Sequence, residues 1–106
     1  MKALNISDYN VAVPFEGVEK DVPYAVRPSL IGLLFSQRDL GVMEILSRDD
    51  IARKIRDWVG DQLLLEDAEF ALLDTAVKAF KGYGKNDVEL VRRVLGAEIV
   101  QPVATR

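Results

Sequence analysis

Residues 63–96 constrain the fold more than any other stretch, because they predict two amphipathic helices joined by a glycine-containing turn. In the first half, apolar side chains recur at three- and four-residue intervals, which places them on one face of a helix. Gly82 suits the left-handed position at which helices commonly end. The inner face of this first helix comprises Phe70, Leu73, Ala76, Val77 and Phe80.

The charges and caps in this stretch agree with that prediction. Acidic residues lie in the first turn of the first helix and lysines near its end, as the helix dipole favours. Asn86, with Glu89 three residues later, has the spacing of a capping box and predicts the start of the second helix. We expect the second helix to end at Gly96 and to pack against the first. Its apolar residues are Val88, Val91, Val94 and Leu95.

Residues 9–15 alternate apolar side chains with smaller or polar ones, which is the period of a half-buried strand. Residues 22–26 repeat the pattern, and the polar segment between them, residues 16–21, predicts a hairpin connection. Pro14 and Pro23 cannot donate a hydrogen bond to a neighbouring strand. We therefore expect these strands to be short, bulged or at the edge of a sheet.

Residues 29–101 contain no proline, and we expect most of this span to be helical. Residues 29–36 are almost all apolar and predict a short buried helix, although an apolar run this short is also compatible with a strand. Residues 40–46 predict a further short helical segment. Its apolar residues are Leu40, Met43 and Leu46.

Ser47, with Asp50 three residues later, resembles a capping box with aspartate in the place of glutamate. This spacing predicts a helix over residues 48–59 that stops at Gly60. Asp49 lies four residues before Arg53, so the outer face of this helix carries a supporting ion pair. The inner face comprises Ile51, Ile55, Trp58 and Val59.

Residues 97–103 predict a third strand, with Pro102 marking an edge or an end. We expect it to join the N-terminal hairpin, so that both termini lie in one small sheet. A chain of 106 residues with 49% hydrophobic side chains can bury one core. The predicted fold is a single domain over residues 1–106, of the α+β class and mostly α. It has four to five short helices and a small antiparallel sheet built from the N-terminal hairpin and the C-terminal strand.

The composition excludes several classes of site, because the chain contains neither cysteine nor histidine. Disulfides, thiol catalysis and thiolate metal sites need cysteine, and histidine is the commonest general base and metal ligand. The net charge is −3, with acids and bases interspersed. No apolar run is long enough to span a membrane. We expect a soluble, cytoplasmic protein that is not an enzyme and has no catalytic residue, metal or cofactor.

Two clusters that resemble chemical sites have simpler structural interpretations. Glu66, Asp67 and Glu69 could bind a divalent cation, but acids are expected at a helix start from the dipole alone. Residues 82–86, GYGKN, superficially resemble a phosphate-binding loop. The glycine spacing, the residue after the lysine and the preceding helix all depart from that motif. We interpret these residues as helix caps and a turn.

Our first functional hypothesis is a non-enzymatic module for protein–protein interaction or assembly. Proline-marked edge strands can pair with another chain, either a partner protein or a second copy in a homo-oligomer. If this is right, Val13→Lys should weaken self-association. The residues that we expect to make the contact are Val11, Val13, Tyr24 and Val26.

The alternative hypothesis is a small regulator that binds nucleic acid through the helical hairpin of residues 63–96. Two helices joined by a glycine turn are also the pattern of a helix-turn-helix protein. Asp87 and Glu89 weigh against it, because carboxylates at the start of the second helix would repel phosphates. The basic residues that would make the contact are Lys78, Lys81, Lys85, Arg92 and Arg93.

Three segments of the sequence resemble known proteins. They are VPYAVRPSLIGLLF, residues 64–69 and GYGKNDVELVRRVLGAEIV. In these segments, and most clearly in GKNDVELVRRVL, it is similar to small proteins encoded in the gene clusters of tailed bacteriophages and prophages. The resemblance covers most of the chain. It implies a virion component, an assembly factor such as a chaperone, or a small regulator of the host, and it assigns no functional residue.

Overall fold

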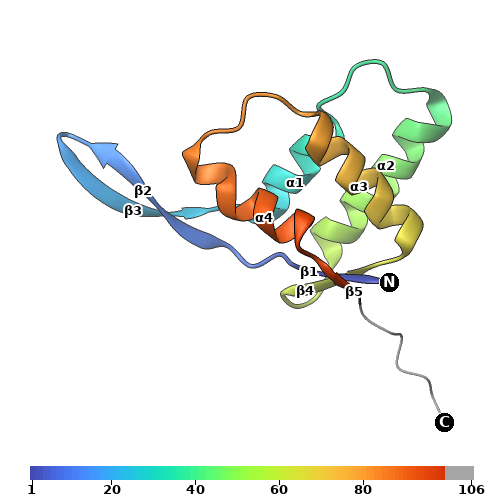
Figure 1. Ribbon diagram of the computed structural model, residues 1–106, viewed down its shortest axis with the longest axis horizontal. Coiled ribbons are helices and arrows are strands. Elements are labelled where there is room, and N and C mark those ends of the chain that lie inside the picture. The colour runs from blue at the N-terminus through green and yellow to red at the C-terminus, as the bar shows by residue number, and fades with distance from the viewer. Residues whose placement is uncertain (100–106) are drawn as a thin grey trace, which may run out of the picture.

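The computed structural model describes residues 1–99, and this part of the chain forms an α+β fold with four α-helices and two antiparallel sheets (Figure 1). Helices make up about half of it, and the predicted α+β class is confirmed. The elements in order are β1 (Lys2–Asn5), β2 (Tyr9–Phe15), β3 (Val18–Tyr24), α1 (Val26–Leu34), α2 (Val42–Asp57), β4 (Gln62–Leu65), α3 (Asp67–Ala79), the 3-10 turn η1 (Lys85–Asp87), α4 (Val88–Leu95) and β5 (Glu98–Ile99).

The larger sheet has the strand order β4-β1-β5 and lies beneath the helices (Figure 1). Strand β1 was not predicted from the sequence. The predicted start of the helical hairpin at residue 63 is wrong, because residues 62–65 form a strand. Leu63 and Leu65 are fully buried while Leu64 is only partly so, which is the period of a strand. Pairing of Leu4 with Leu63 joins this strand to β1. A short leucine run suits a helix or a strand, and the partner strand decides between them.

The predicted N-terminal hairpin is present as β2 and β3, which form a two-stranded sheet of their own. The connection is shorter than predicted: only Glu16 and Gly17 lie between the strands, and both have positive φ values, of 50° and 82°. This is the conformation of a two-residue hairpin turn. The C-terminal strand β5 pairs with β1 and not with the hairpin, so the expected single sheet is wrong. Residues 100–103 of that predicted strand lie outside the described residues.

Helix α2 is one continuous helix, where the sequence predicted two segments with a cap at Ser47. Its first turns are exposed, so the apolar residues expected there do not form part of the core; Val42, Met43 and Leu46 are among the exposed residues. Ile51 and Ile55 are buried as predicted. The helix ends at Asp57, and Val59 is 94% exposed instead of lying on the inner face.

The two helices predicted for residues 63–96 are present as α3 and α4, and they contact each other. Helix α3 is capped by Glu66 and Glu69, which form a reciprocal capping box. Helix α4 follows η1 and has Asp87, not Asn86, as its N-cap residue, and the Asp87 carboxylate accepts a hydrogen bond of 2.8 Å from the N–H of Gly84. Its inner residues are Leu90 and Val94, whereas Val88 and Leu95 are exposed.

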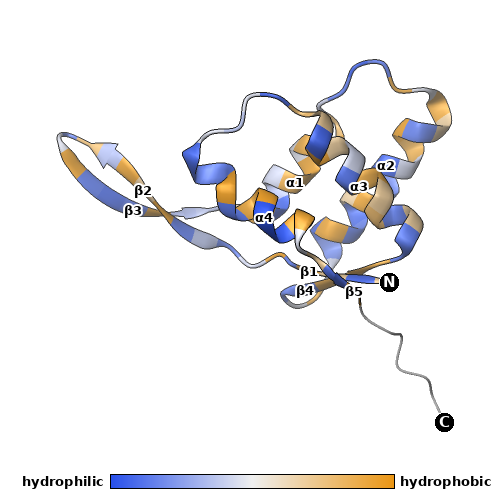
Figure 2. Cartoon of the chain, in the orientation of Figure 1, coloured by the Kyte–Doolittle hydropathy of each residue, from blue (hydrophilic) through white to orange (hydrophobic). Residues whose placement is uncertain are grey.

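The core lies between the helices and the larger sheet, and Figure 2 shows the apolar positions distributed through these elements. The hairpin extends away from this body in Figure 1. We call this hairpin, residues 9–24, the arm. The buried core residues are Leu4, Ile6, Val26, Leu30, Leu33, Leu34, Ile51, Ala52, Ile55, Leu63, Leu65, Leu73, Ala76, Val77, Leu90 and Val94.

Candidate protein-interaction surface

The base of the arm is joined to η1 and α4 by two tyrosines. Tyr9 and Tyr24 are directly opposite each other, and their rings stack with centroids 4.7 Å apart. The Tyr9 hydroxyl donates to the carbonyl oxygen of Asn86 at 2.7 Å and accepts from the Leu90 N–H at 3.2 Å. The Tyr24 hydroxyl donates to the Asp87 carboxylate. These bonds hold the first and the last residue of the arm in place.

Two charged residues complete this attachment. The Arg93 guanidinium lies over the Tyr9 ring, 5.0 Å from its centroid, and donates to the Ser7 carbonyl oxygen at 2.6 Å. Asp8 accepts a hydrogen bond of 2.9 Å from the N–H of Val26 at the start of α1. The chain on both sides of the arm is therefore tied to helices α1 and α4.

The tyrosine hydroxyls at the base remain protonated well above neutral pH. Burial, and donation of a hydrogen bond to the Asp87 carboxylate, raise the pKa of Tyr24 to about 12. Burial is also the main cause that raises the pKa of Tyr9. Both groups act as neutral hydrogen-bond donors in the attachment of the arm.

One face of the arm is mostly apolar, and it is interrupted only by Lys20, which lies opposite Val13. Val11 lies opposite Val22, and Phe15 lies opposite Val18. Toward the tip this face is open to solvent, since Phe15 is 60% exposed and Val18 is 67% exposed. Lys20 covers part of Phe15, with its ammonium group 5.7 Å from the ring centroid. Apolar surface of this kind is costly in water and favours contact with another molecule.

The turn geometry determines which backbone groups of the arm face outward. In a two-residue hairpin, Phe15 and Val18 exchange backbone hydrogen bonds, and every second pair along the ladder does the same. The residues between those pairs direct their N–H and C=O groups away from the partner strand. Pro14 and Pro23 occupy such outward positions, so neither proline interrupts the ladder.

The two outer edges of the arm differ in chemistry. On β3 the remaining outward positions are Glu19 and Asp21, whose charges discourage pairing with another strand. On β2 they are Asn10 and Ala12, which are uncharged. The edge of β2 is thus the more permissive one for an additional strand.

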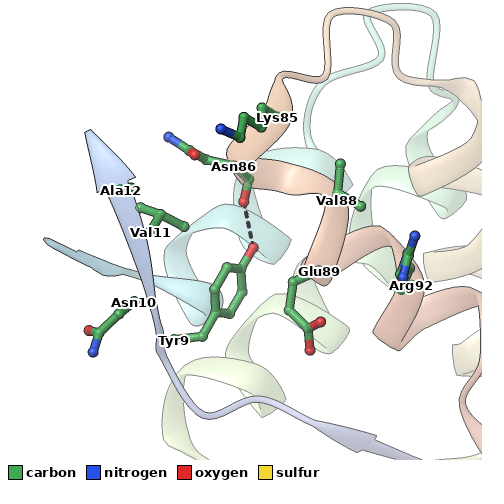
Figure 3. A pocket seen from close by; sticks show the side chains of 9 residues that line it. All are labelled: Tyr9, Asn10, Val11, Ala12, Lys85, Asn86, Val88, Glu89 and Arg92. Atoms are coloured by element: carbon green, nitrogen blue, oxygen red, sulfur yellow. Dashed lines mark hydrogen bonds between the residues drawn. The ribbon is translucent and has the colours of Figure 1, made fainter. Parts of the chain in front are cut away.

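A groove of about 470 Å³ runs between this edge of β2 and the segment η1–α4 (Figure 3). On the side of β2 it is lined by residues 9–12. On the other side, Val88 lies between two cations, Lys85 and Arg92, neither of which forms an ion pair within residues 1–99. Glu89 also lines the groove, but its carboxylate binds Arg93 at 2.8 Å.

The structure brings together most of the residues predicted for protein interaction. Val11 and Val13 share the apolar face of the arm, and Tyr24 lies on the same face at the base. Val26 does not belong to this set: it is the first residue of α1 and is fully buried in the core. The predicted strand over residues 22–26 ends at Tyr24, because helix α1 begins there and needs an apolar residue facing inward.

The basic residues of the alternative hypothesis do not form one surface. Lys78 pairs with Asp74 at 3.0 Å. Arg93 forms an ion pair with Glu89 and a hydrogen bond at the base of the arm. The structure places only two of them in the same groove, Lys85 and Arg92. Lys81 is exposed in the segment after α3.

The acidic side chains at the start of α3 form hydrogen bonds and ion pairs with other parts of the fold. The Glu69 carboxylate accepts from the Glu66 N–H and from Lys54 Nζ, both at 2.8 Å. Asp67 binds the amino group of Met1 at 2.8 Å, which lowers the pKa of this aspartate. Over residues 1–99, no group of three or more His, Cys, Asp or Glu side chains is placed to hold a metal ion.

The groove could not be predicted from the sequence, because its two walls are far apart in the chain. One signal was present: Pro14 at an outward position implies that Ala12 and Asn10, two and four residues earlier, also face outward. No local pattern indicated that Lys85, Val88 and Arg92 lie across from them.

No protein-family model, curated protein or solved structure matches the chain. None of the helices in residues 1–99 combines the length and the apolar character that crossing a membrane requires.

Proposed function

We propose that the protein is a non-enzymatic interaction or assembly module whose arm contacts another protein chain, with a second copy in a homo-oligomer as the first partner to test. The observation that carries this proposal is the exposed apolar face of the arm, with Phe15 and Val18 at its tip. A two-stranded hairpin has little stability of its own in water. Contact with a second protein would bury its apolar face and stabilise it.

Under this proposal the protein acts as a virion component or as an assembly factor such as a chaperone, in the host cytoplasm or in the virion. The resemblance to proteins of tailed-bacteriophage and prophage gene clusters supports such a role. A projecting arm attached to a folded body also suits assembly, because the arm can reach a neighbouring subunit without rearranging the core.

The experiment is the solution mass by light scattering, at several protein concentrations and at two salt concentrations. We expect a defined oligomer that persists at high salt, because burial of apolar surface is not screened as ion pairs are. Val13→Glu should dissociate it. Glutamate is a better probe here than lysine, because position 13 lies opposite Lys20 and a second lysine would repel it.

Val59→Glu is the matched control, since it makes the same change at an exposed valine in the segment after α2. It should leave the mass of the oligomer unchanged. A wild-type protein that is monomeric at every concentration would overturn self-association through the arm. Equal loss of mass in both variants would overturn the assignment to the arm.

A further inference from the structure

We infer that the groove between β2 and η1–α4 binds an extended segment of a partner protein that adds a strand to the edge of β2 and carries carboxylate side chains. The inference rests on the proposed function, a protein-interaction module, and names the chemistry of its partner. It concerns the groove at the base of the arm, and not the apolar face at its tip.

The first observation is the open backbone edge. Asn10 and Ala12 are at outward positions of the ladder, so their N–H and C=O groups are directed to the free side of β2. Within residues 1–99, β2 pairs with β3 alone. An added strand would satisfy these groups through main-chain hydrogen bonds, which supply affinity in this mode of recognition.

The second observation is the shape of the site. The added strand would not lie on an open surface, because η1 and α4 form a second wall that includes the exposed side chain of Val88. Every second side chain of the added strand would point to the side of the arm on which Tyr9 and Val11 lie. Figure 3 shows Val11 directed toward η1 while Asn10 points away from it. Those side chains of the added strand would therefore enter the groove.

The third observation is charge, which selects what those side chains are. Lys85 and Arg92 line the groove without an ion pair in the described part of the chain. The carboxylate of Glu89 is neutralised by Arg93. The groove is thus complementary to carboxylates on the entering side chains, with an apolar contact available at Val88.

The chain does not offer such a segment in its own arm. A second copy that added its β3 to this edge would match Glu19 and Asp21 with the outward positions Asn10 and Ala12. Residues directly opposite each other share a face, so both carboxylates would point away from the groove. Lys20, on the other face, would then approach Lys85. A partner of different sequence fits the charges better than a second copy.

The experiment titrates the full-length, isotopically labelled protein with the blocked peptide Thr-Val-Glu-Val-Glu-Val-Thr and follows backbone amide signals by NMR. We expect saturable shifts at Asn10 and Ala12 and along η1–α4. The peptide in which both glutamates are replaced by glutamine should bind more weakly. Lys85→Gln and Arg92→Gln should each weaken binding of the acidic peptide by roughly fivefold. Lys81→Gln, at an exposed lysine outside the groove, should leave it unchanged.

A pair of proline variants tests the role of the strand edge. Ala12→Pro removes an outward N–H of β2, as Pro14 already does two residues further along the strand, and it should abolish binding. Asp21→Pro makes the same change directly opposite, on β3, and should preserve binding. Should either proline disrupt the arm, as judged by loss of the Tyr9 and Tyr24 signals, the glutamine variants still decide the question.

Three results would overturn the inference. They are equal binding of the acidic and neutral peptides, shifts that map to the edge of β3, and absence of peptide binding together with saturable binding of a DNA duplex at Lys85 and Arg92. Each can occur while the oligomer in light scattering persists, in which case the groove assignment fails and the proposed function of the arm remains. If the wild-type protein is monomeric and still binds the acidic peptide, self-association through the arm fails and the groove assignment remains.

Discussion

Arg27 illustrates how one side chain can terminate a helix to which it does not belong. Its guanidinium donates to the carbonyl oxygens of Ile55 at 3.1 Å and Trp58 at 2.7 Å, and to that of Gly60 at 2.9 Å. The last carbonyls of a helix lack partners within the helix and carry partial negative charge. A cation from α1 thereby closes the end of α2 and ties the two helices together.

We expect Arg27→Ala to lower the free energy of unfolding by about 2 kcal/mol, because hydrogen bonds to charged groups contribute roughly 1.5–3 kcal/mol. Urea denaturation measures the difference. Arg53→Ala is the control: Arg53 is exposed and binds only Asp49 within α2, so its loss should cost about 0.5 kcal/mol or less. Equal losses in the two variants would contradict the assignment of Arg27 as the residue that caps α2.

The tyrosines at the base of the arm predict a dependence of stability on alkaline pH. The pKa of Tyr24 is about 12 in the folded protein and 10.0 for the free side chain, so the folded state retains this proton more strongly. Its contribution to stability is fully present below pH 10.0 and is lost as the pH rises toward 12. Tyr24→Phe should therefore show a smaller fall in the free energy of unfolding across this window than the wild type. Parallel curves for the two proteins would contradict this.

At the scale of elements, two glycines have opposite roles. Gly17 has a φ value of 82° in the turn of the arm, where a side chain is strained even though its Cβ would meet no atom. Gly32 lies inside helix α1, and a Cβ at this position would also meet nothing within 4 Å. There the glycine only lowers helix propensity.

We expect Gly32→Ala to raise the free energy of unfolding by about 0.5–1 kcal/mol. Gly17→Ala should instead loosen the arm, by about 1 kcal/mol of local opening free energy. Hydrogen exchange of the amides in β2 and β3 measures the local effect, and urea denaturation measures the global one. Faster exchange of the arm in the Gly32 variant, or unchanged exchange in the Gly17 variant, would be inconsistent with these roles.

Some elements could be predicted because their signals are local. The buried positions of α3, such as Leu73, and the alternation in β2 both follow from spacing along the chain. The continuity of α2 did not follow. The spacing around Ser47 is typical of a helix cap. Arg48, however, is fully buried and donates a hydrogen bond of 3.0 Å to the carbonyl oxygen of Leu34. This turn therefore remains helical and packs on α1.

At the scale of the whole molecule, the arm and the body are built on different principles. The body buries its apolar residues between four helices and the sheet β4-β1-β5. The arm has no core of its own and depends on the contacts of Tyr9 and Tyr24 with η1 and α4. The self-association test and the peptide test belong to this scale, because both concern surfaces that the body holds in place and leaves uncovered.

The amino-acid sequence was sufficient to establish the α+β class, the N-terminal hairpin, the presence of helices α3 and α4, and the edge character of the proline-containing strands. All of these depend on residues a few positions apart, whose spacing determines which face or which backbone group is exposed. The placement of β1 between β4 and β5, the burial of Val26 and the groove between residues 9–12 and residues 85–92 came only from the tertiary structure. These features join segments that are distant in the chain, and it is the burial of apolar surface across the whole molecule that selects such pairings.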